Sequence, residues 1–134
     1  MDHFKTIKLQ RTRCDGNCPV YKLSIHYKGR VTYTGIDCVE KKGRFIWQLD
    51  SETIKKLNDA LIESNYFDLK RKEVDTDLTD MPFCITTIEL MNGDKRKIEH
   101  YLQPNDEWPL CLLRFERQVC KLAGLAKWVG VVND

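Results

Sequence analysis

Alternating apolar and polar side chains mark the first part of the chain as a series of β-strands. The alternation is clearest at residues 20–27, where Tyr21 and Leu23 face one side and Lys22 and Ser24 face the other. Turn signals follow this strand, including a two-residue Lys-Gly connection at residues 28–29. The pattern predicts an antiparallel meander whose other three strands lie at residues 4–10, 30–35 and 44–49.

Apolar side chains at three- and four-residue spacing predict two helices. The first runs from residue 51 to about residue 62, and Asp50 or Ser51 caps its unpaired backbone N–H groups. The second begins at Pro109 and ends near Ala123, because Gly124 follows it. The expected buried side chains are Ile54, Leu57 and Leu61 in the first helix and Leu112, Phe115, Val119 and Leu122 in the second.

A second hairpin lies between the helices. Asn92-Gly93 separates strands expected at residues 83–91 and 96–102, and both turn residues are expected at positive φ. The element order is then ββββ-α-ββ-α. This order predicts an α+β fold for one domain spanning residues 1–134, with both helices packed on one face of a mostly antiparallel sheet.

Composition narrows the class of protein. A chain of 134 residues with 42% hydrophobic and 31% charged residues can bury a core without metal or disulfide support. The net charge of +2 comes from basic and acidic residues spread along the chain, which gives nucleic-acid binding no support. No apolar run is long enough to span a membrane, and no export signal opens the chain, so we expect neither membrane contact nor export and place it in the cytoplasm.

The densest group of special residues is Cys14-Asp15-Gly16-Asn17-Cys18-Pro19-Val20-Tyr21. Gly16 and Asn17 allow a turn that brings the two sulfurs together. Three interpretations stay open: a structural turn with packed thiols, a reversible disulfide, or half of a zinc site. The zinc interpretation needs two further ligands, and Cys14 and Cys18 are then its weak metal candidates; otherwise no cofactor is expected.

This segment resembles the opening of an uncharacterised bacterial domain-of-unknown-function family with the motif Cys-x-Gly-x-Cys-Pro-x-Tyr. The resemblance runs from about Thr6 to Trp128 and includes Tyr33-Thr34-Gly35 and Thr79-Asp80-Met81-Pro82. It implies a fold shared with that family and no established activity.

Other candidate residues give weaker signals. The Asp75 to Asp80 segment is rich in oxygen but lacks calcium-loop spacing, so it is better interpreted as a turn. His100 shares a strand face with Ile98 and is expected to point inward. Cys38 and Cys84 are expected to be small buried residues. No catalytic residue is assigned, because no nucleophile, base and acid are brought together by a recognised motif.

Two functions of different class follow. The first is a small non-catalytic domain that binds a protein or a small-molecule ligand, as a monomer or weak homodimer, with binding residues drawn from Cys14, Gly16, Cys18, Tyr21, Asp80 and His100. Trp47, Trp108 and Trp128 are candidate contact residues, each more simply placed at the core edge. The alternative is a thiol-redox or zinc-binding protein centred on the Cys14 to Cys18 loop.

Overall fold

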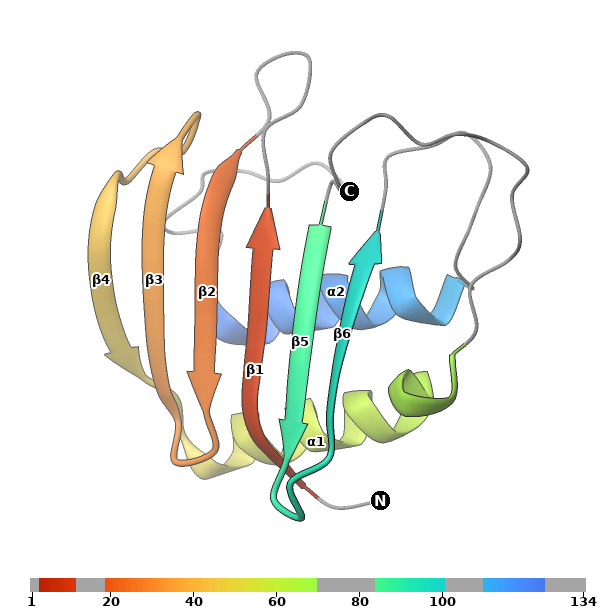
Figure 1. The fold of residues 1–134 in the computed structure, drawn as a ribbon. Coiled ribbons are helices and arrows are strands. Elements are labelled where there is room, and N and C mark those ends of the chain that lie inside the picture. Colours follow the sequence, from red (N-terminus) through yellow and green to blue (C-terminus); the bar gives the residue numbers. More distant parts are fainter. Residues whose placement is uncertain (1–2, 12–18, 70–83, 101–109, 125–134) are drawn as a thin grey trace, which may run out of the picture.

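A computed structural model describes residues 3–11, 19–69, 84–100 and 110–124. They form a six-stranded antiparallel sheet with two α-helices, which lie together behind it in Figure 1. The expected α+β fold and its ββββ-α-ββ-α order are confirmed. The elements are β1 (Phe4–Arg11), β2 (Val20–His26), β3 (Arg30–Asp37), β4 (Gly43–Gln48), α1 (Ser51–Ser64), the short 3-10 helix η1 (Tyr66–Asp68), β5 (Cys84–Leu90), β6 (Lys95–His100) and α2 (Leu110–Ala123).

The strand order is β4-β3-β2-β1-β5-β6. The first four strands form the expected meander, while the β5–β6 hairpin pairs with the free edge of β1. This pairing places β1 near the middle of the sheet, with Lys8 opposite Ser24 of β2 on one side and Thr87 of β5 on the other. Strands that are distant in sequence therefore form one continuous surface.

The core lies between the sheet and the helices. Alternate residues of the central strands, such as Ile7, Leu9, Leu23 and Ile25, are at most 2% exposed. Apolar side chains of both helices cover them, and α1 contacts α2. The expected helix stripes are confirmed at Leu57, Leu61, Leu112, Phe115 and Val119, while Ile54 and Leu122 are half-buried.

Three buried polar side chains on the helices, Asn58, Ser64 and Glu116, depart from the simple stripe pattern. Asn58 of α1 accepts a hydrogen bond of 3.0 Å from the backbone N–H of Phe4, which ties the helix to the start of β1. Glu116 of α2 is only 2% exposed. At the other end of α1, Asp50 is the N-cap, and its carboxylate accepts a 2.8 Å hydrogen bond from the Thr53 N–H.

Both tight hairpins differ from the expected two-residue turns. Gly29 donates its N–H to His26 O at 2.8 Å, and Gly93 donates to Leu90 O at 3.0 Å. Within these two turns positive φ occurs only at Gly29 (100°) and Gly93 (97°), so the expectation of positive φ at Asn92 is wrong. In each turn two residues precede a left-handed glycine, which is a common arrangement for a three-residue hairpin loop.

The expectation that Cys38 is buried is also wrong. Cys38 is exposed and has a φ of 52°, because the chain turns sharply beyond β3. Cys84 is fully buried, as expected. Trp47 lies at the core edge, where its indole N–H donates to Ala123 O at 3.0 Å. Neither helix in the described parts of the chain is long and apolar enough to cross a membrane.

Candidate functional site

The sheet face turned away from the helices carries a set of lysines. We call this surface the open face. Lys8 projects from it between the buried Ile7 and Leu9 of β1, and Lys22 projects between the buried Tyr21 and Leu23 of β2. Period-two geometry directs these charged side chains to the side opposite the core. The two lysines of β6 complete the set, Lys95 and Lys97, and all four are exposed.

Hydroxyl groups lie between the lysines. Thr87 of β5 pairs in register with both Lys97 and Lys8, and Ser24 pairs with Lys8 and Thr32. Five neighbouring strands therefore present a straight line of cations and hydroxyls. This line, which we call the central row, is Lys97, Thr87, Lys8, Ser24 and Thr32.

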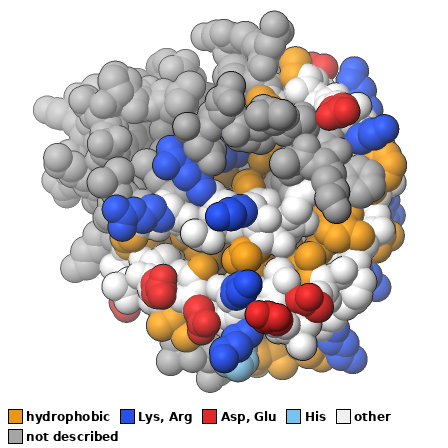
Figure 2. Space-filling model, turned by 180° about the vertical axis from the view of Figure 1, so that it is seen from behind, with side chains coloured by type: hydrophobic (Ala, Val, Ile, Leu, Met, Phe, Trp, Pro, Cys, Tyr) orange, Lys and Arg blue, Asp and Glu red, His pale blue; other side chains and the backbone are white. Residues whose placement is uncertain are grey.

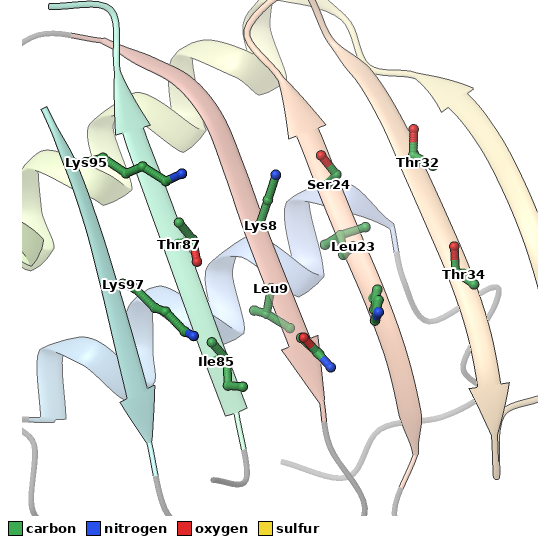
Figure 3. Close-up of a pocket in the computed structure, with 12 residues that line it drawn as sticks. Lys8, Leu9, Leu23, Ser24, Thr32, Thr34, Ile85, Thr87, Lys95 and Lys97 are labelled. Atoms are coloured by element: carbon green, nitrogen blue, oxygen red, sulfur yellow. The ribbon is translucent and has the colours of Figure 1, made fainter. Parts of the chain in front are cut away.

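A hollow of about 440 Å³ lies over the central row. Figure 3 shows the amino groups of Lys95 and Lys97 extending from β6 over its neighbours, and the side chain of Lys8 rising from β1 between them and β2. Gln10, Lys22 and Thr34 line the hollow beside the central row. Its walls are low because short Ser and Thr side chains alternate with the lysines, so the site is a shallow trough rather than an enclosed cavity.

Electrostatics distinguishes the open face from the helix side. Lys97 lies 3.6 Å from Glu99. Lys8, Lys22 and Lys95 have no carboxylate within salt-bridge distance among the described residues. On the helix side, seen in Figure 2, acidic and basic side chains are interspersed. Positive charge that is only partly neutralised, by Glu99 beside Lys97, attracts an anion, and more strongly at low ionic strength.

A second polar group lies on the helix side, at the end of the sheet. Arg11 ends β1 and is in register with Tyr21 of β2 and Cys84 of β5. Two residues of α2 face them: the Tyr21 hydroxyl lies 3.7 Å from Cys120 Sγ, and Glu116 interacts electrostatically with Cys84 and Arg11. We call these five residues the buried cluster.

Burial dominates the chemistry of the buried cluster. Burial raises the pKa of the Cys84 thiol well above its ordinary value of 9.0, and it raises the pKa of the Tyr21 hydroxyl in the same direction. Burial also opposes the charge of Arg11, but its neighbours Cys84, Tyr21, Cys120 and Glu116, in that order of size, more than offset it and raise the Arg11 pKa. The two thiols of the cluster are therefore protonated at neutral pH and poor nucleophiles.

The buried cluster is best explained as a structural connection. It joins the ends of three strands to α2 through hydrogen bonds and opposite charges, and Cys84 and Glu116 are at most 2% exposed. The described residues include no group of three or more His, Cys, Asp and Glu side chains that could hold a metal ion. The open face is thus the stronger candidate for contact with a ligand.

The sequence-predicted site residues have different outcomes. Tyr21 belongs to the buried cluster and is 4% exposed. It lies at the start of β2, the strand that follows the cysteine motif. The backbone of His100 pairs with Cys84 in the same row of the sheet, and the inward direction of its side chain stays a prediction. The remaining candidates lie outside the described residues: Cys14, Gly16, Cys18 and Asp80, together with Trp108 and Trp128.

The lysines of the open face were missed because the sequence shows them spread along the chain. A usable signal was present at the outward positions of the expected strands. Lys8 and Lys22 each stand between two apolar residues, so each must face away from the core. If both helices cover one side of the sheet, all such positions gather on the other side. Only the pairing of β1 with β5 then brings β6 and its lysines to this surface.

Comparison with known proteins provides a family and no activity. A family model described as a domain of unknown function (DUF6438) matches residues 5–123. No curated protein matches the chain. The matched range includes both helices and all but the first residue of the six strands, so the similarity concerns the whole described fold.

Proposed function

Because the chain belongs to the DUF6438 family, whose description assigns no activity, we propose from its geometry that it is a non-catalytic binding domain for an anionic ligand. The ligand binds on the open face. The observation that carries this proposal is the group of lysines and hydroxyls aligned by the register of five strands, over a hollow that the helices leave uncovered.

The chemistry of the open face supports binding. Lysine ammonium groups and Ser or Thr hydroxyls all donate hydrogen bonds, and oxyanions accept them. Bringing the charges of Lys8 and Lys22 onto one folded surface costs free energy by mutual repulsion, and an anion placed between them relieves it. The described residues that line the hollow include no carboxylate, histidine or cysteine, and their ammonium, hydroxyl and amide groups can all donate hydrogen bonds to an anion.

The buried cluster supports the same proposal from the other side of the sheet. It fixes the ends of β1, β2 and β5 against α2, and thereby holds three of the strands that carry the open face at constant register. A rigid platform lowers the entropy lost when a ligand orders the surface. The polar connection at the sheet end and the donor surface are thus parts of one arrangement.

Calorimetric titration with poly-L-glutamate at neutral pH tests the proposal. The variant Lys8→Gln/Lys22→Gln removes two charges from the open face, and Lys55→Gln/Lys121→Gln removes two exposed charges from the helices as a matched control. We expect the open-face variant to raise the Kd by about 3- to 30-fold, because each exposed ion pair contributes a modest free energy. The control is expected to change it less than twofold. Equal effects of both variants, or no binding by the unaltered protein, would overturn the proposal.

The family match does not establish a role for the cysteine motif, so its role is a proposal. We propose the Cys14 to Cys18 loop as a family signature and, in the alternative function, as the centre of a thiol-redox or zinc site. No described residue favours either chemistry over a structural turn. A mass measurement of the protein purified without reductant or chelator separates them, since zinc adds mass and a disulfide removes two hydrogens.

A further inference from the structure

We propose that the ligand of the open face is an extended acidic segment of a partner protein, with carboxylate side chains at alternating positions. This inference rests on the proposed function and specifies its occupant. It follows from the direction, length and flanks of the central row.

The central row is long and straight. It crosses from Lys97 on β6 to Thr32 on β3, which is four strand spacings, or about 19 Å at 4.8 Å per spacing. A single carboxylate or phosphate occupies only a fraction of that length. An extended peptide rises about 3.3 Å per residue, so about six residues cover the central row.

The side-chain spacing of such a peptide fits the central row. Alternate residues of an extended chain point to the same side at intervals of about 6.7 Å. Three carboxylates at this interval lie between Lys97 and Thr87, at Lys8, and between Ser24 and Thr32. The first position offers the Lys97 cation and the Thr87 hydroxyl, the second offers the Lys8 cation, and the third offers the hydroxyls of Ser24 and Thr32. Lys22, two residues from Ser24 on the same face of β2, supplies a further cation at the third position.

Two acidic residues define the flanks of the central row near β6. Glu99 is in register with Ile85 on one side of the Lys97–Thr87 pair, and Glu89 is in register with Lys95 on the other. Their carboxylates repel an acidic chain that strays from the central row, while Lys97 attracts one that follows it. Attraction along one line with repulsion beside it selects an elongated anion in a fixed direction.

The same surface is poorly suited to single-stranded nucleic acid. Proteins that bind unpaired strands combine positive charge with aromatic rings on which bases stack. The described residues that line the hollow are lysines, hydroxyl and amide residues and aliphatic residues, and none of these carries a ring. The donors of the open face therefore match carboxylates on a polypeptide better than a chain of bases.

Two peptides of identical composition test this inference. One has three glutamates at alternating positions among four threonines, and the other has the three glutamates in succession between paired threonines. Both carry the same charge, but only the first places all three carboxylates on one side of an extended chain. We expect the alternating peptide to bind the unaltered protein about two- to fivefold more tightly, as befits one additional exposed ion pair. We also expect this preference to disappear in Lys8→Gln/Lys97→Gln and to persist in Lys55→Gln/Lys121→Gln.

The outcomes separate this inference from the broader proposal. Equal affinity for the two peptides, with both still bound more weakly by Lys8→Gln/Lys97→Gln, overturns the extended acidic segment and leaves anion binding intact. Tighter binding of an oligouridine eight nucleotides long, through the same lysines, also overturns it in favour of nucleic acid. The chain itself has acids at alternating positions 73, 75 and 77, so sedimentation of the free protein is required as well. A dimer that dissociates in Lys8→Gln/Lys97→Gln would identify a second copy of the chain as the occupant. It would overturn the assignment to a partner protein.

Discussion

The hydroxyl of Tyr21 on β2 lies 3.7 Å from the Sγ atom of Cys120 on α2, and these residues are 99 positions apart in sequence. The contact joins the strand end that follows the cysteine motif to the last helix. Tyr21 also interacts electrostatically with Arg11, its register partner on β1. One phenol hydroxyl therefore links the two layers of the fold at the edge of the buried cluster.

Replacing Tyr21 with Phe tests this link. The change leaves the ring in place but removes the hydroxyl, so that buried partners lose a hydrogen bond. We expect the free energy of unfolding to fall by about 1–2 kcal/mol. Urea denaturation measures the change, and Tyr27→Phe in a partly exposed turn is the control, expected within about 0.5 kcal/mol of the unaltered protein. Equal stability of the two variants would show that the hydroxyl makes no net contribution.

Glu116→Ala tests the charges of the buried cluster. Glu116 is 2% exposed and interacts electrostatically with Arg11, so its removal leaves a guanidinium with less compensation inside the protein. We expect a loss of about 3 kcal/mol, against less than about 0.5 kcal/mol for the exposed Glu63→Ala. In a double-mutant cycle with Arg11→Met, the two losses should add to more than the loss of the double variant. Strict additivity would contradict a direct coupling.

Alkaline pH should destabilise the protein through Cys84. Burial raises the pKa of this thiol above its ordinary value of 9.0, so the folded state holds the proton more tightly than the unfolded state. The stabilisation is complete below pH 9.0 and is lost as pH rises further. Denaturation under reducing conditions between pH 7.5 and 10.5 should show the decline. Cys84→Ala should lessen the slope above pH 9 by about 1 kcal/mol per pH unit, and an unchanged slope in this variant would contradict the assignment.

Acid should weaken the N-cap of α1. The hydrogen bond from Thr53 lowers the pKa of Asp50 below its ordinary value of 3.8, so its charged form stabilises the folded state above that pH. The contribution is lost as pH falls through the lowered pKa. Asp50→Asn keeps a capping oxygen and removes the titration. Its Tm should therefore fall less than that of the unaltered protein between pH 5 and pH 2. Equal falls in Tm for the variant and the unaltered protein would show that Asp50 does not contribute to the loss of stability in acid.

Local sequence patterns were sufficient to predict the elements, because each strand and helix buries one face. They were insufficient for Glu116, which reads as a solvent-facing charge, although its spacing from Leu112 and Val119 places it on the buried stripe. They also favoured a two-residue turn at Asn92, where the structure has a longer one. The choice between these turns depends on strand register, which the local sequence does not reveal.

The open face could be predicted only in part for the same reason. The outward direction of Lys8 follows from its apolar neighbours. Its position beside Thr87 depends on the long-range pairing of β1 with β5, which no local pattern encodes. A site composed of single residues from five strands is thus visible only once the strand order is known. The positions of Cys14, Gly16, Cys18 and Asp80 remain predictions.

The most direct test of anion binding on the open face is an amide chemical-shift titration of the ¹⁵N-labelled protein with poly-L-glutamate. The account predicts that the largest shifts fall on β1, β2 and β5, around Lys8, Lys22 and Thr87, with little change in α2. Exposed cations on α2, namely Arg114, Arg117 and Lys121, provide the internal comparison. Shifts concentrated around these helix residues, with the open face unchanged, would contradict the account.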